Sequence, residues 1–130
     1  MTNQELIAKA KEAMTKAYAP YSHFQVGAAL LAKDGRVFTG CNVENATYGA
    51  TICAERTAVT KAVSKGVREF EKIAIVASSG EYAAPCGICR QVLFEFMPEG
   101  KVVLWSELEG EKEFALTELL PFGFRGEDIK

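Results

Sequence analysis

The chain has 130 residues, 48% of them hydrophobic, and a formal net charge of −2 at pH 7. This length suits one domain, residues 1–130, with a sizeable core, and the small negative charge argues against a nucleic-acid partner. No apolar run could cross a bilayer and residues 1–6 do not resemble a signal peptide, so we expect a cytoplasmic protein with no membrane partner.

The first predicted element is a helix. Thr2 and Glu5 have the spacing of a capping box, and small or apolar residues then recur at helical intervals. Pro20 is expected to end the helix. The stripe that should face the core comprises Leu6, Ala10, Ala13, Met14 and Ala17.

Two strands are predicted next, over residues 24–32 and 36–44. The dipeptide Asp34-Gly35 between them is a strong hairpin signal. Along the second strand, Asn42 and Glu44 are two residues apart and should point to the same side. From the strand pattern alone, such a polar pair faces solvent.

The register of this hairpin is open between two alternatives. A two-residue loop would place Lys33 opposite Arg36, whereas a three-residue loop would place Ala32 there. Only the three-residue loop brings Phe24 opposite Glu44 on a shared face, as a common pocket would require.

Helices and strands alternate through the rest of the chain, which implies a sheet flanked by helices. The turn at residues 108–110 is so short that it can only join an antiparallel pair. A capped turn then precedes Pro121, and the tail carries exposed-looking aromatic residues. The expected elements are a helix over 53–65, a strand over 72–78, a helix from Pro85 to about Pro98, and strands over 101–106 and 111–115.

Three of the four cysteines stand where helices begin. If Pro85 opens a helix, Cys86 and Cys89 lie on one face of its first turn and can bind one ion. Cys53 opens another helix, and a helix N-terminus favours thiolate over thiol. The fourth cysteine, Cys41, lies in a strand pattern and is expected to be a buried bystander.

Three thiols without an obvious fourth ligand favour a catalytic zinc site over a structural one. The single histidine, His23, is far away in sequence and is more typical of an ordinary surface or core residue. Glu55 follows Cys53 by two residues and could act as a base beside the metal. A glutamate in a first helical turn can also serve only as a partner of the helix dipole.

Several fragments together resemble the cytidine deaminases over nearly the whole chain. The sequence Cys-Ala-Glu at 53–55 and Pro-Cys-x-x-Cys at 85–89 match the zinc deaminase signature. Residues 20–29, 40–46 and 119–129 also look like segments of this family. With cysteine at position 53, the chain resembles the short, homotetrameric branch of the family. The nucleic-acid editors and the longer dimeric branch carry histidine there.

This resemblance implies a fold, a cofactor and a reaction. The expected fold is a three-layer α/β/α arrangement with a mixed five-stranded sheet, in which strands 4 and 5 are antiparallel. Cys53, Cys86 and Cys89 would bind one Zn²⁺ per chain. Glu55 would move a proton from the zinc-bound water to ring N3 and then to the leaving amine. Cytidine and deoxycytidine would be converted to uridine and deoxyuridine with release of ammonia, in pyrimidine salvage.

The resemblance also implies substrate contacts. Asn42 and Glu44 would hold the ribose hydroxyl, Phe24 would pack against the base, and the Ala54 backbone would contact the pyrimidine. The chain would form a homotetramer in which a tail phenylalanine, Phe124 by alignment, covers the site of a neighbouring subunit. Phe122 is the other candidate for this contact.

Arg56 is assigned a supporting role by charge. Three thiolates outweigh the charge of Zn²⁺, so a nearby cation is needed to withdraw electron density from the sulfurs. The Arg56 fork could donate to two cysteine sulfurs and cannot lose its charge. The alternative for Arg56 is a surface salt bridge.

Three rival functions remain open at this point. A thiol oxidoreductase would use the Cys86–Cys89 pair, but it leaves Cys53 and Glu55 unexplained. A non-catalytic zinc module would not need Glu55. A deaminase of nucleic acid or of a cytosine-containing antibiotic would share the zinc signature, although the expected ribose contacts fit a plain nucleoside.

Overall fold

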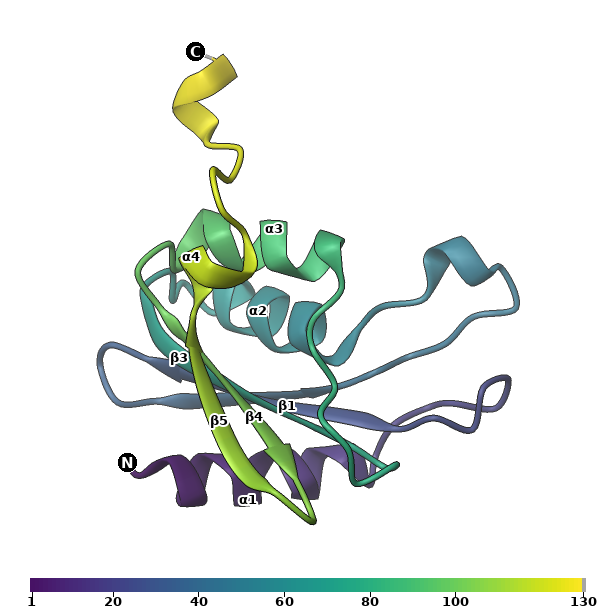
Figure 1. Ribbon diagram of the computed structural model, residues 1–130. Helices are drawn as coiled ribbons and strands as arrows, with labels where there is room; N and C mark the ends of the chain where they lie inside the picture. Colours follow the sequence, from purple (N-terminus) through teal and green to yellow (C-terminus); the bar gives the residue numbers. More distant parts are fainter. Residues whose placement is uncertain (130) are drawn as a thin grey trace.

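The computed structural model describes residues 1–129 (Figure 1). A five-stranded sheet lies between helix α1 on one face and helices α2 and α3 on the other (Figure 1). The elements in chain order are α1 (Asn3–Met14), β1 (Val26–Ala32), β2 (Val37–Cys41), η1 (Tyr48–Ala50), α2 (Ala54–Ser64), β3 (Phe70–Ala77), α3 (Gly87–Phe96), β4 (Lys101–Ser106), β5 (Gly110–Ala115), α4 (Leu116–Leu119) and η2 (Gly126–Ile129).

The sheet is mixed, with the strand order β2-β1-β3-β4-β5. Strand β1 pairs antiparallel with both β2 and β3, and β4 pairs antiparallel with β5. Strands β3 and β4 are parallel, with α3 as the crossover between them. Parallel neighbours need such a crossover, and this one carries two of the cysteines to the end of β3. The predicted α/β/α layers are thereby confirmed.

The hairpin between β1 and β2 has the three-residue loop. The Ala32 N–H donates to the Arg36 carbonyl at 2.9 Å, and the Gly35 N–H donates to the Ala32 carbonyl at 3.0 Å. Gly35 has a φ of +96°, a conformation that favours glycine. Residues 33–35 therefore form the loop, and the same register brings Asn42 opposite Val26, where the Asn42 N–H donates to the Val26 carbonyl at 3.3 Å.

Both faces of the central strands are buried. Ala28 and Leu30 face α2 and α3, whereas Ala29 and Leu31 face α1. A strand covered on both faces reads as a nearly continuous apolar run. The α1 side is a small cluster comprising Leu6, Ile7, Ala10, Ala29, Leu31, Ala74, Val76 and Val103.

Some predicted boundaries were wrong. Helix α1 begins with the expected capping box but ends at Met14, well before Pro20. The segment after it is drawn away to pair with the end of the hairpin, where the Tyr18 N–H donates to the Asn42 carbonyl at 3.0 Å. Helix α3 begins at Gly87 rather than Pro85, because Cys86 has extended backbone angles and is the N-cap.

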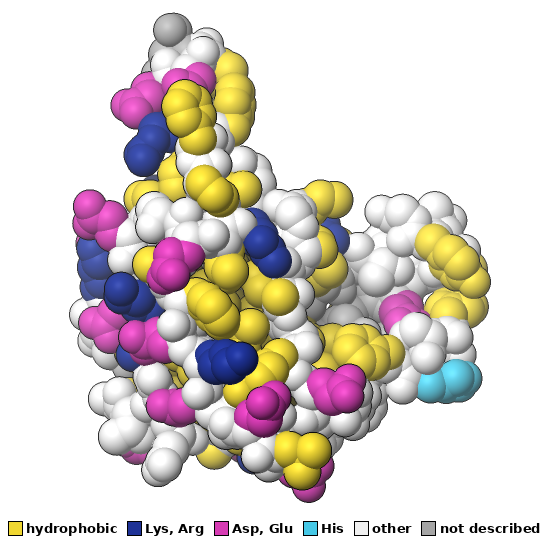
Figure 2. All heavy atoms as spheres, viewed as in Figure 1, with side chains coloured by type: hydrophobic (Ala, Val, Ile, Leu, Met, Phe, Trp, Pro, Cys, Tyr) yellow, Lys and Arg dark blue, Asp and Glu magenta, His cyan; other side chains and the backbone are white. Residues whose placement is uncertain are grey.

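Beyond α4 the chain leaves the body of the molecule, and residues 122–129 form a projecting tail (Figure 1). Phe122 is fully exposed and Phe124 is 55% exposed, which confirms the predicted exposure of the tail aromatics. Hydrophobic side chains are visible on this projection in Figure 2. Within residues 1–129, no helix has the length and apolar character needed to cross a bilayer.

Candidate metal and active site

The site forms where helices α2 and α3 begin. Cys53 is the N-cap of α2 and Cys86 is the N-cap of α3, and both have extended backbone angles. Cys89 lies three residues after Cys86, on the first turn of α3. Helices α2 and α3 pack on the same face of the sheet, so their N-termini bring the three side chains together.

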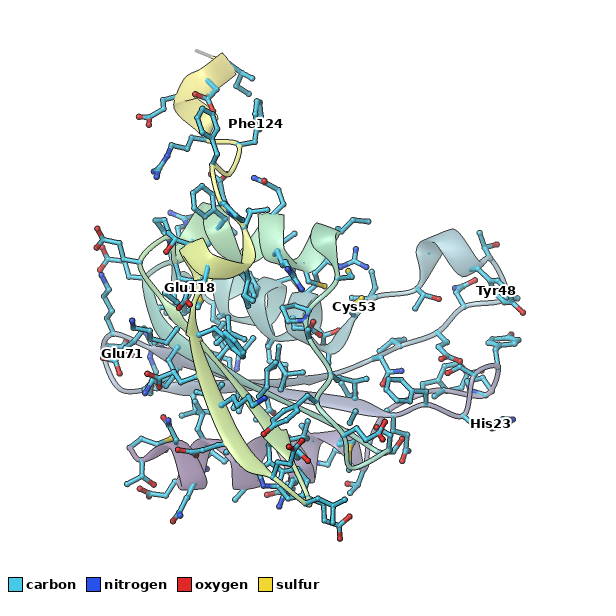
Figure 3. All side chains as sticks on the ribbon, viewed as in Figure 1. His23, Tyr48, Cys53, Glu71, Glu118 and Phe124 are labelled. Atoms are coloured by element: carbon cyan, nitrogen blue, oxygen red, sulfur yellow. The ribbon has the colours of Figure 1, made fainter. Side chains whose placement is uncertain are left out.

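The sulfur atoms of Cys53, Cys86 and Cys89 all lie within 4.8 Å of one another. Cys89 is buried, Cys53 is half-buried and Cys86 is exposed, so the cluster is open on one side. It is the one group of metal-binding side chains of this kind within residues 1–129. His23 lies far from Cys53, on the same side of the molecule as Tyr48 (Figure 3), and is not part of the cluster.

The thiols of Cys53 and Cys89 strongly influence each other's ionisation. A hydrogen bond from the Cys89 thiol, assisted by Arg56, lowers the pKa of Cys53 to about 5. The same hydrogen bond, together with burial, raises the pKa of Cys89. Cys53 therefore favours the charged thiolate, whereas Cys89 favours the neutral thiol. A soft divalent cation would relieve this conflict, and the donor set therefore fits zinc, which favours thiolate ligands.

Arg56 lies beside one cysteine sulfur, whereas the charge argument expects its fork to donate to two. Its Nη2 atom donates to the Cys53 sulfur at 3.6 Å and to the Thr51 carbonyl at 3.2 Å. Its Nε atom is buried and has no hydrogen-bond partner within the described residues. The guanidinium thus contacts one cysteine sulfur directly, and it is not a surface salt bridge.

Glu55 is buried beside the sulfurs. It is the second residue of α2 and only 5% exposed. Burial raises the pKa of its carboxyl group, and the negative charge of Cys53 adds to this effect. A carboxyl group of raised pKa is suited to exchange protons near neutral pH.

A pocket lies beside the turn that precedes β1. The Glu44 carboxylate accepts hydrogen bonds from the backbone N–H groups of Tyr21 at 3.0 Å and Ser22 at 3.1 Å, and also from the Ser22 hydroxyl. These bonds lower the pKa of Glu44, and the bond from the Ser22 hydroxyl has the largest effect. Glu44 lines a pocket of about 240 Å³ with Tyr21, Ser22, Asn45, Tyr48 and Thr51.

Asn42 is not a solvent-facing residue, contrary to the expectation from the strand pattern. It is 8% exposed, and its Nδ2 donates to the Phe24 carbonyl at 2.8 Å while its Oδ1 accepts from the Val26 N–H at 2.9 Å. Asn42 therefore shapes the backbone at the start of β1. Phe24 is 42% exposed and is not among the residues that line the Glu44 pocket.

The expectation for Cys41 was wrong, and Tyr21 and Tyr48 were not identified from the sequence. Cys41 is half-buried rather than buried. Tyr21 and Tyr48, which pack edge to face with ring centroids 6.0 Å apart, had no distinguishing signal. They are separated in sequence and meet only because the loop after β2 folds towards the turn before β1.

Comparison with known proteins agrees with this geometry. The family described as "Cytidine and deoxycytidylate deaminase zinc-binding region" matches residues 1–105. A cytidine deaminase of Sporosarcina psychrophila is 49% identical over 130 residues, which cover 99% of this chain and 96% of that protein. A cytidine deaminase of Halalkalibacterium halodurans is 51% identical, covering 99% of this chain and 98% of that protein.

Solved structures give the same result. The crystal structure of cytidine deaminase from Burkholderia pseudomallei superposes with a TM-score of 0.90 at 50% identity, covering 95% of this chain and 100% of that one. That of cytidine deaminase from Mycobacterium tuberculosis has a TM-score of 0.83 at 41% identity, covering 95% of this chain and 98% of that one.

Proposed function

Because the chain belongs to the cytidine and deoxycytidylate deaminase family, we propose that it hydrolyses cytidine and deoxycytidine to uridine and deoxyuridine with release of ammonia. The observation that carries this proposal is the cluster of Cys53, Cys86 and Cys89 with Glu55 buried beside it. The role that we infer for the reaction is the salvage of pyrimidine nucleosides.

The three cysteine sulfurs would hold one zinc ion per chain. A zinc ion with three protein ligands keeps a position open for water and lowers the pKa of that water to about 7, which supplies a nucleophile at neutral pH. Arg56 supports the ligand set by donating to the Cys53 sulfur, which offsets the negative charge of the thiolates.

Glu55 is the proton carrier in this proposal. Its carboxyl group is held in a buried position next to the sulfurs, and its raised pKa favours the acceptance of a proton. Glu55 would accept one proton from the attacking water at a carboxylate oxygen and donate it to ring N3 of cytosine. It would then accept the second proton from the new C4 hydroxyl and donate it to the departing amine. Because the same group acts as base and acid, a pKa closer to neutrality than usual assists both steps.

The nucleoside would be held at its ribose by Glu44 and Asn42 and at its base by Ala54 and Phe24. The Glu44 carboxylate keeps a low pKa and is therefore a charged acceptor for a ribose hydroxyl. One Nδ2 hydrogen of Asn42 is used by the Phe24 carbonyl, so the second could reach the same hydroxyl. Ala54 is the first residue of α2, where backbone N–H groups lack helical partners and could face the pyrimidine. Phe24 would pack against the base.

The exposed tail supports a proposal of self-association. We infer a homotetramer in which Phe124 covers the pocket of a neighbouring subunit. Phe124 lies on the projecting tail, far from Cys53 and Tyr48 of its own chain (Figure 3). Its ring can therefore contribute to a site of this kind only in another copy of the chain.

One experiment tests the proposed function. The zinc-loaded protein is incubated with cytidine, deoxycytidine, cytosine or CMP, while the loss of cytosine absorbance and the release of ammonia are followed. We expect both nucleosides to be deaminated, because Glu44 and Asn42 select for the sugar. If neither nucleoside releases ammonia, the proposal is refuted. Disulfide reduction without zinc would favour a thiol oxidoreductase instead.

A further inference from the structure

The course of the C-terminal tail is set by one face of helix α3. At the point where the tail departs, Arg90 donates from Nη1 to the Leu119 carbonyl at 2.8 Å. The same guanidinium donates from Nε to the Pro85 carbonyl at 2.7 Å, directly before Cys86. Arg90 thus connects the metal-binding segment with the end of α4.

The tail then passes over the next residues of α3. Gln91 donates from Nε2 to the Phe124 carbonyl at 2.8 Å. Gly123 lies so close to Phe94 that a Cβ atom there would be 2.8 Å from Cε2 of the ring. The guanidinium of Arg125 lies over the same ring, 5.0 Å from its centroid. Gln91 of α3 therefore contacts the backbone of Phe124, and Phe94 of α3 contacts the residues on either side of Phe124.

We propose that Gln91 is a positioning residue that directs the Phe124 ring towards the neighbouring subunit. The inference rests on the proposed function and on the proposed role of Phe124. A projecting segment with few contacts can adopt many directions, and each restraint on its backbone reduces the cost of ordering it when substrate binds. Gln91 supplies such a restraint at Phe124 itself.

This arrangement links two active sites. Gln91 is two residues beyond Cys89, so the helix that carries metal ligands in one subunit also holds the residue that closes the pocket of another. The Gln91 side chain does not contact a cysteine through any hydrogen bond within the described residues. It can therefore be changed without removing a contact of the metal ligands, unlike Arg90, which also holds the Pro85 carbonyl.

The test is Gln91→Met, which keeps an unbranched side chain of similar length and removes the donor. Gln4→Met is the matched control, because Gln4 is an exposed helical residue far from the tail. In Gln91→Met we expect the KM for cytidine to rise roughly 2–10-fold, the effect of one lost hydrogen bond, with kcat within about 2-fold. Zinc content should not change, and amide hydrogen exchange of residues 122–129 should become faster. Gln4→Met should match the wild type in all these measurements.

A double-mutant cycle shows whether Gln91 acts through Phe124. In a Phe124→Ala background, Gln91→Met should cause no further rise in KM, because the ring that it positions is absent. An unchanged KM in active Gln91→Met, or a rise of equal size in both backgrounds, would overturn the inference and leave the proposed function intact. An inactive wild-type protein would overturn the proposed function, and this inference with it.

Discussion

The Nη2 atom of Arg56 lies 3.6 Å from the sulfur of Cys53 and donates a hydrogen bond to it. A set of three thiolates carries more negative charge than one zinc ion can balance, and this cation partly offsets the excess. Replacement of Arg56 by Gln keeps a donor but removes the charge. We expect Arg56→Gln to lose roughly 10–100-fold in zinc affinity or turnover, as is typical when a partner of a metal ligand is lost.

The pH dependence of Arg56→Gln has a defined sign. The Cys89 hydrogen bond and then Arg56 lower the pKa of Cys53, so loss of Arg56 should raise that pKa and let protons compete with zinc at higher pH. The rising limb of the pH–rate profile should move to higher pH, and Cys53→His in the same background should recover part of the loss. Arg68→Gln, an exposed control, should behave like the wild type. Full activity of Arg56→Gln with an unchanged profile would contradict this explanation.

Glu55→Gln should separate metal binding from proton transfer. Glutamine has nearly the same shape but cannot carry a proton, so we expect zinc to be retained while kcat falls roughly 10²–10⁴-fold. Metal analysis and steady-state kinetics on the same preparation measure the two effects. The matched control is Glu12→Gln on the exposed side of α1, which should keep full activity. Substantial turnover by zinc-replete Glu55→Gln would rule out the proposed proton carrier.

Gly40→Ala should disturb the site through packing. A Cβ atom at Gly40 would lie 2.4 Å from the Ala54 carbonyl oxygen and 2.6 Å from the Ala58 nitrogen, so α2 would have to move away from β2. We expect destabilisation of about 1–3 kcal/mol together with weaker zinc binding, because Cys53 and Glu55 are at the start of that helix. Thermal unfolding and zinc titration are the measurements. The control is Gly49→Ala, where the added Cβ atom would have no neighbouring atom within 4 Å. Equal stability of the two variants would contradict the prediction.

The tail aromatics give a prediction about assembly. We expect sedimentation to show a tetramer, and we expect Phe124→Ala to raise the KM for cytidine roughly 2–10-fold, the usual scale of one aromatic contact. Phe122→Ala should have little effect on KM, because the Phe122 side chain is fully exposed and is not assigned to the pocket. An active monomer, or a larger effect from Phe122→Ala than from Phe124→Ala, would refute this assignment.

Local chemistry explains which features could be predicted. The spacing of Cys86 and Cys89 places both sulfurs on one helical turn whatever surrounds it. The capping box of Thr2 and Glu5 is likewise complete within one turn. The hairpin was predicted from Asp34-Gly35, whereas its register stayed open until the structure showed the three-residue loop with a left-handed Gly35. Each of these features depends on residues only a few positions apart.

Features that join distant segments were decided by the tertiary structure. The sequence suggested that Arg56 could reach the cysteines, but the contact with Cys53 exists because α2 begins with extended backbone at that residue. Asn42 turned to the backbone of Phe24 and Val26, since a buried amide must satisfy its hydrogen bonds. The hydrogen bond from Gln91 to the Phe124 carbonyl joins residues that share no local pattern. Such contacts depend on how helices and loops pack on the sheet, and packing is a property of the whole chain that no short window of sequence contains.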